Sequence, residues 1–120
     1  MALPTPRRGE IWTASLGERS QRHWVLIVSL DGRNLSDRVD TVLALPFGSR
    51  GMQGPTVLML PPGETGLPGI SYLKAHFITT LPKAKLIERV PRVLTRSRMR
   101  EVVTVIQRAI DPDAPYQPQK

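Results

Sequence analysis

The chain has 120 residues, which is enough for one domain with a single hydrophobic core. It carries 17 Lys and Arg residues against 10 Asp and Glu residues, a formal net charge of +7 at pH 7, and it contains no cysteine. This composition excludes a disulfide framework and thiolate metal sites, and the charge favours an acidic partner, either nucleic acid or an acidic protein segment. A protein from a high-arginine proteome would show the same balance on an ordinary soluble surface, so the placement of the charges has to decide.

Neither a membrane span nor a secretory signal is expected. No stretch approaches the roughly 20 apolar residues of a transmembrane helix. The first eight residues lack the apolar segment of a signal peptide. Together with the absence of cysteine, these features lead us to expect a cytoplasmic protein.

Short apolar runs separated by Gly and Pro predict a series of short strands. Residues 1–7 are expected to form a flexible lead-in, and residues 31–34, Asp-Gly-Arg-Asn, are expected to form a turn, since Gly and Asn tolerate left-handed backbone. The run at residues 24–29 is continuously apolar, which is typical of a strand buried on both faces. The predicted strands cover residues 10–15, 24–29, 41–45, 56–60, 70–73 and 77–81, with Pro46 ending the third.

The last predicted element has a helical period. Thr95 is expected to cap its N-terminus, and Asp111 followed by Pro112 to end it. Apolar side chains recur at helical spacing at Met99, Val102, Val103, Ile106 and Ile110. Core packing explains this stripe, so the helix is expected to dock on the strands. Residues 112–120 are expected to form a flexible tail.

Short strands followed by one helix predict a mainly β, α+β domain, a small barrel with a C-terminal helix packed on it. Basic residues fall in loops of this scheme, where ligands usually bind. They are Arg19, Arg22, His23, Arg33, Arg38 and Arg50.

Four motifs, in order, resemble those of the MazF/PemK family of toxins. Arg-Gly-Glu-Ile-Trp at residues 8–12 matches the typical start, and Val-Leu-Ile-Val-Ser at residues 25–29 followed by Asn34 matches the second motif. Gly-Leu-Pro at residues 66–68 with Thr-Leu-Pro-Lys at residues 80–83, and Met-Arg-Glu-Val at residues 99–102, match the later ones. The resemblance implies an SH3-like, PemK-like barrel with a C-terminal helix over residues 8–111.

The resemblance also implies a function. Family members are toxins of type II toxin–antitoxin pairs and metal-independent endoribonucleases that cut single-stranded RNA by attack of the ribose 2′-OH on the adjacent phosphate. The implied partners are single-stranded RNA, an acidic antitoxin and a second copy of the chain in a homodimer. No cofactor is implied, and neither histidine has metal-type spacing to another ligand.

At the positions of the family's site this chain differs. The resemblance places His23 at the family arginine, with Arg22 one residue earlier as another source of a guanidinium, and Gly48 at the family threonine. Candidate catalytic residues are Arg22, His23, Ser49 and His76, which supply two imidazoles for acid–base chemistry near neutrality and groups that hold a phosphate. Candidate RNA-binding residues are Arg19, Trp24, Arg50 and Lys74.

Two alternatives to the nuclease stay open. The histidines are then surface residues of a toxin relative that cleaves weakly or only binds antitoxin or RNA, or the protein is a CcdB-like poison that binds DNA gyrase. The missing hydroxyl at Gly48 favours these alternatives. The start at residues 8–12 and the segment at residues 81–83 favour the nuclease.

Overall fold

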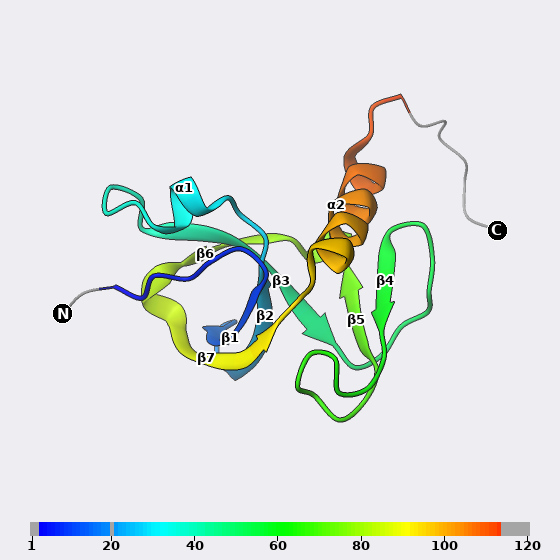
Figure 1. Cartoon of the computed structure of the whole chain (residues 1–120), viewed down its shortest axis with the longest axis horizontal. Coiled ribbons are helices and arrows are strands. Elements are labelled where there is room, and N and C mark those ends of the chain that lie inside the picture. The colour runs from blue at the N-terminus through cyan, green and yellow to red at the C-terminus, as the bar shows by residue number, and fades with distance from the viewer. Residues whose placement is uncertain (1–2, 20, 114–120) are drawn as a thin grey trace.

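Seven antiparallel strands and a long C-terminal helix form the protein, in a computed structural model that describes residues 3–19 and 21–113 (Figure 1). The strands are β1 Glu10–Leu16, β2 Gln21–Ile27, β3 Thr41–Gly48, β4 Val57–Leu60, β5 Ser71–Lys74, β6 Thr79–Pro82 and β7 Leu86–Val93. The helices are α1 Asp31–Asn34 and α2 Arg96–Ile110, with 3-10 turns η1 Ala75–Phe77 and η2 Lys83–Lys85. The prediction of a mainly β domain with a packed C-terminal helix is confirmed.

Strand β3 organises the sheet because it pairs with three other strands. The strand order is β4-β5-β3-β2-β1-β7, and β6 pairs with β3 over Thr41–Ala44, while β5 pairs with Phe47 and Gly48. Pro46 falls between these two pairings, so its missing N–H interrupts neither of them. The prediction that Pro46 ends the third strand is therefore wrong, since β3 continues to Gly48.

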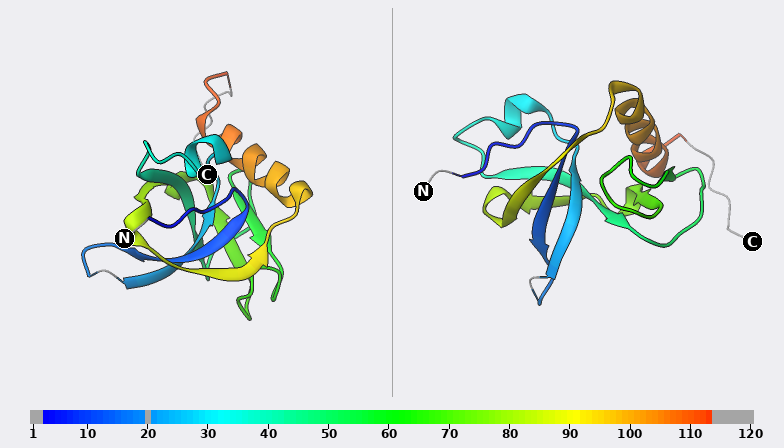
Figure 2. Two further views of the ribbon diagram at one scale, coloured as in Figure 1. Left: turned by 60° about the vertical axis from the view of Figure 1, so that its left-hand side comes forward. Right: turned by 60° about the horizontal axis from the view of Figure 1, so that its bottom comes forward.

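Strands β1, β2, β3, β6 and β7 curve into a small barrel, in which η2 joins β6 to β7 and contacts β1 (Figure 2). β4 and β5 lie outside this barrel, beside α2 (Figure 1). β7 was not predicted from the sequence, because its exposed charged residues and Pro91 hide the apolar pattern. Proline is tolerated there because β7 lies at the edge of the sheet.

Side chains from the two faces of β2 enter two separate cores. Val25 and Ile27 pack inside the barrel, whereas Leu26 packs with Ile11 and α2 on the other face. All three β2 side chains are fully buried, which confirms the prediction of a strand covered on both faces. The barrel and the helix layer are therefore held together through one continuous strand.

The helix α2 begins and docks nearly as its sequence predicts. Thr95 Oγ1 accepts a hydrogen bond of 3.1 Å from the N–H of Arg98, the predicted N-cap. Val103 and Ile110, expected in the buried stripe, are 43% and 72% exposed, and Val105 is buried instead. The contact face is thus turned by part of a helical turn towards β4 and η1.

Residues 31–34 are not the turn that their composition predicts. They form α1, which a buried pair of side chains holds in place: Asn34 Nδ2 donates to the carbonyl of Ser29 at 2.8 Å, and Ser29 Oγ donates to Asn34 Oδ1. Asn34 is completely buried, so the tertiary contact overrides the turn preference.

The ends of the chain were expected to be flexible over residues 1–7 and 112–120. Within the first of these segments Pro6 is buried, and the N–H of Arg7 donates to Glu10 at 2.7 Å. Residues 1–2 and 114–120 lie outside the described part of the chain. No helix among the described residues has the length and apolar character needed to cross a membrane.

Candidate functional site

Two of the predicted site segments meet where β2 and β3 separate. Their ladder runs from Ile27 opposite Ala44 to Val25 opposite Pro46, after which β3 turns away to pair with β5. Just beyond this end lie residues 22–24 on β2 and residues 47–49 on β3. The positions at which this chain departs from the family motifs therefore follow the same end of this ladder, although about 25 residues separate them in sequence.

Arg22 and His23 belong to β2 rather than to the preceding loop, and they point to opposite faces of it. His23 lies opposite Ala14, a barrel-core residue, and is partly buried on that side. Arg22 lies on the other side and forms an ion pair of 3.3 Å with Glu88 of β7. Because both partners are more than half exposed, this pair contributes at most about 1 kcal/mol and leaves Arg22 free to exchange partners.

Trp24 shares the face of Arg22 and packs beneath the loop of residues 61–70. A Cβ on Gly66 would lie 3.2 Å from Trp24 Cζ3, and the φ of Gly66 is 91°, so only glycine suits this close crossing. Trp24 is partly buried against the α2-side core. Its indole therefore supports the loop, and only its exposed part is available for stacking on a base.

A cavity of about 290 Å³ opens beside this loop, between residues 47–49 and residues 67–71. Ser49 is exposed at its rim, and Ser71 lies in its wall. The Ser71 hydroxyl is 3.2 Å from that of Thr65, a buried contact that fixes the loop against β5. The cavity thus places a serine hydroxyl at the same end of the sheet as Arg22.

A basic and aromatic surface covers the outer face of β5. The loop after β3 folds back over this face, so that a Cβ on Gly51 would lie 3.0 Å from Lys74 Cε and 3.2 Å from the Tyr72 ring. Lys74 Nζ lies 5.9 Å from the centre of the Phe77 ring. Arg50, next to Gly51, is exposed on the same loop. The structure thus brings two predicted RNA-binding residues, Arg50 and Lys74, together.

Tyr72 and Phe77 did not figure in the sequence prediction. Their spacing around Lys74 could have indicated them, because residues two apart in a strand, such as Tyr72 and Lys74, lie on the same face. Phe77 is 59% exposed, an unusual state for a phenylalanine.

His76 lies away from Ser49, and Arg19 precedes β2. Ser71, in the cavity wall, begins β5, whereas His76 follows its last residue and is exposed on η1, which contacts α2. The length of β5 therefore separates His76 from Ser49. Arg19 is exposed in the turn between β1 and β2. No group of three His, Asp or Glu side chains among the described residues could hold a metal ion.

These features define a class of protein, a small β-barrel domain with a basic site where two of its strands diverge. Residues 7–110 match the family of PemK-like, MazF-like toxins of type II toxin–antitoxin systems. The chain belongs to this family, and the resemblance seen in its four motifs is confirmed.

Solved structures of similar proteins have the same fold. An endoribonuclease in complex with its cognate antitoxin from a mycobacterial species is 27% identical, with a TM-score of 0.74 over 92% of this chain and 99% of that chain. An endoribonuclease from a mycobacterial species is 25% identical, with a TM-score of 0.75 over 96% and 100%. The fold is also that of the Mycobacterium tuberculosis toxin MazF-mt6, at 20% identity and a TM-score of 0.73 over 88% and 99%. A comparison with curated protein sequences gives no match.

Proposed function

We propose that this protein is a toxin that cleaves single-stranded RNA without a metal ion, by attack of a ribose 2′-OH on the adjacent phosphate. The observation that carries the proposal is the meeting of residues 22–24 and 47–49 at one end of the β2–β3 ladder. Membership of the family and likeness to two proteins described as endoribonucleases support it.

In this proposal the scissile phosphate lies between the end of β2 and Ser49. His23 takes the proton of the 2′-OH, as the imidazole side chain does in many general-base reactions. Arg22 exchanges its exposed partner Glu88 for the phosphate, whose developing charge a guanidinium stabilises. The Ser49 hydroxyl donates a hydrogen bond to the same phosphate.

His76 needs a different route to this phosphate, because β5 separates it from Ser49 within one chain. A homodimer is part of the proposal, and a second copy of the chain then supplies His76 as the acid for the leaving 5′-oxygen. Arg19, Trp24, Arg50 and Lys74 are proposed to hold the RNA on either side of the cut.

An acidic antitoxin is the proposed protein partner. One of the similar structures is described as an endoribonuclease with its cognate antitoxin, and the charge of +7 on this chain is complementary to an acidic segment. The cytoplasm, where RNA substrates are found, is the proposed location.

The test is to incubate the purified protein with a long RNA in EDTA and to map the new ends. We expect cuts at one short sequence, each with a 2′,3′-cyclic phosphate, that disappear in Arg22→Ala and His23→Ala. Arg38→Ala, an exposed arginine away from the site, is the matched control and should cut normally. Intact RNA after incubation with correctly folded protein overturns the proposal.

A second candidate function rests on Gly48, which offers no side chain where the family carries a hydroxyl. A protein with this loss would act by binding, as a poison of DNA gyrase does. Intact RNA together with tight binding of purified gyrase would support this candidate instead.

A further inference from the structure

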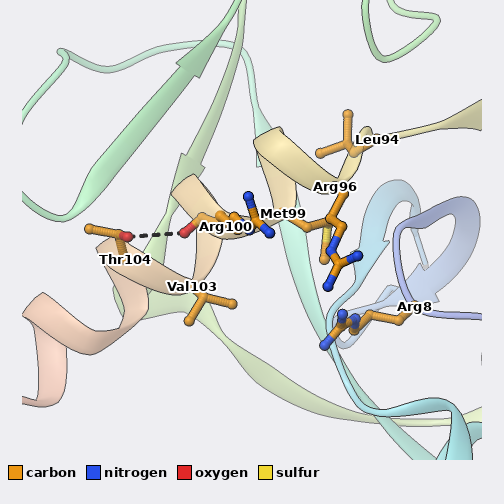
Figure 3. Close-up of a pocket in the computed structure, with 7 residues that line it drawn as sticks. All are labelled: Arg8, Leu94, Arg96, Met99, Arg100, Val103 and Thr104. Carbon is orange, nitrogen blue, oxygen red and sulfur yellow. Dashed lines mark hydrogen bonds between the residues drawn. The ribbon is translucent and has the colours of Figure 1, made fainter.

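Three arginines from two separate segments surround a groove of about 560 Å³ at the start of α2. Arg8 precedes β1, whereas Arg96 and Arg100 lie one helical turn apart on α2. Figure 3 shows the guanidinium groups of Arg8 and Arg96 pointing toward one another across this groove. Leu94 and Met99 also line it.

These three guanidinium groups have no carboxylate partner within ion-pair distance among the described residues, whose salt bridges involve other arginines. Asp31 lies nearby but accepts the backbone N–H of Arg8, at 2.7 Å. The first turn of α2 contains no acidic residue. Like charges one helical turn apart and cations at a helix N-terminus both destabilise the helix, so stability does not explain this arrangement.

The groove offers charge rather than apolar surface. Leu94 and Met99 are only 4% and 7% exposed, so their apolar surface is already covered, and Val103 is the more exposed apolar residue of the lining, at 43%. Among the residues that the structure describes, no aromatic ring on which a base could stack lines the groove. A ligand recognised here must therefore carry several negative charges, and it gains little from apolar side chains or bases.

We infer that this groove, formed by Arg8, Arg96 and Arg100, is a second RNA subsite that binds the sugar–phosphate backbone away from the cleavage position. Planar guanidinium groups fit phosphate oxygens in pairs, and a polynucleotide presents a phosphate at every residue whatever its sequence. An acidic peptide would have to place several carboxylates together and would leave its apolar side chains without a pocket. This inference rests on the proposed function, because it takes RNA as the ligand.

The subsite and the candidate cleavage site lie at opposite ends of β1. Arg8 precedes the first residue of the strand, and Arg22 lies opposite Ser15 near its other end. At about 3.3 Å per residue, β1 alone separates them by on the order of 15 Å. An RNA that spans only the cleavage sequence would not reach the subsite, whereas a longer strand would.

The test compares a short RNA limited to the cleavage sequence with one of about 20 nucleotides, longer than the sites of typical single-strand binders. Both are 2′-O-methylated for binding measurements, which blocks the attacking hydroxyl, and unmodified for cleavage. The variant is Arg8→Gln with Arg96→Gln and Arg100→Gln. Its control, Arg38→Gln with Lys85→Gln and Arg108→Gln, removes the same charge from exposed positions outside both sites.

We expect the groove variant to bind the long RNA about tenfold more weakly at low salt and to cleave the short RNA at the normal rate. The plot of log binding constant against log salt concentration should become shallower by about 2 units of slope. Each contact to a single-strand phosphate contributes about 0.7, and the variant removes three arginines. An equal loss of affinity for the long RNA in the groove variant and the control overturns the inference. Poly-glutamate is the probe for an acidic peptide, and a groove variant that loses affinity for poly-glutamate but not for RNA also overturns it. If the wild type neither cuts nor binds RNA, the proposed function fails as well; if it cuts and the groove variant binds long RNA normally, only the subsite fails.

Discussion

Arg98 on α2 donates two hydrogen bonds to the carboxylate of Glu64, from Nε to Oε2 at 2.8 Å and from Nη2 to Oε1 at 3.1 Å. Both side chains are about 70% covered, at 29% and 28% exposed. The hydrogen bond to Glu64 raises the pKa of Arg98 above its ordinary value. This pair ties the loop of residues 61–70 to the helix, and the same loop crosses Trp24 and walls the cavity beside Ser49.

Replacing this carboxylate should loosen the loop. Glu64→Gln is expected to lower the free energy of unfolding by about 1 kcal/mol, because a two-point, charge-assisted pair is lost at a partly covered position. Urea unfolding followed by the fluorescence of the two tryptophans, Trp12 and Trp24, measures the stability. The control is Glu101→Gln, which removes a more exposed carboxylate, 46% exposed, from the same arginine and should cost less. Equal losses would contradict a special role for Glu64.

Gly48 has room for the family's hydroxyl. A Cβ there would lie 3.7 Å from the carbonyl oxygen of Tyr72 and 3.8 Å from that of Arg50, ordinary contact distances, and its backbone is not left-handed. Gly48→Thr should therefore fold normally, with stability unchanged or raised by up to about 1 kcal/mol because threonine suits a strand.

The same substitution should raise RNA cleavage if the hydroxyl hydrogen-bonds the phosphate. Gly48→Val is the matched control, since it has nearly the same shape without the hydroxyl. We expect cleavage in Gly48→Thr to exceed that in Gly48→Val by about tenfold, the effect of one added hydrogen bond to a charged group. Equal rates in the two variants would show that this position takes no part in the chemistry.

The sequence predicted the scaffold well and the site only in part, for reasons visible at single residues. The apolar run of β2 and the period of α2 arise from local pattern, so their structures were predictable. Residues 31–34 read as a turn because the contact that makes them helical joins Asn34 to Ser29 and cannot be seen from composition. The family motif identifies His76 as a candidate from the sequence. Only the direction of β5 shows that His76 lies at the opposite end of that strand from Ser71 and the cavity beside Ser49.

Gly51 is predicted to be required for the basic surface on β5. Its φ of 152° is a backbone region that other residues rarely adopt, and the space for a Cβ is filled by Lys74 and Tyr72. Gly51→Ala should lower the free energy of unfolding by about 1–3 kcal/mol. It should also weaken RNA binding, because Arg50 and Lys74 lose their common placement. Gly32→Ala on α1, where nothing lies within 4 Å of the added Cβ, is the control and should lower neither quantity.

Asn34, the asparagine that follows the second motif, is predicted to act through folding rather than through RNA. Its amide donates to the carbonyl of Ser29, and the Ser29 hydroxyl that donates to Asn34 also accepts the N–H of Leu43, at 3.0 Å. Asn34→Ala removes the acceptor of the buried Ser29 hydroxyl and the side-chain donor to the Ser29 carbonyl, and should cost about 2–3 kcal/mol of unfolding free energy.

A double-mutant cycle with Ser29→Ala should show coupling of more than about 0.5 kcal/mol, because the two side chains contact each other directly. Thermal and urea unfolding give the stabilities, and cleavage is measured at a temperature where both variants remain folded. The rate there should match the wild type, since α1 is separated from the end of β2 that carries Arg22 by the length of that strand. A cleavage rate that falls while the variant remains folded would show that Asn34 takes part in the RNA site.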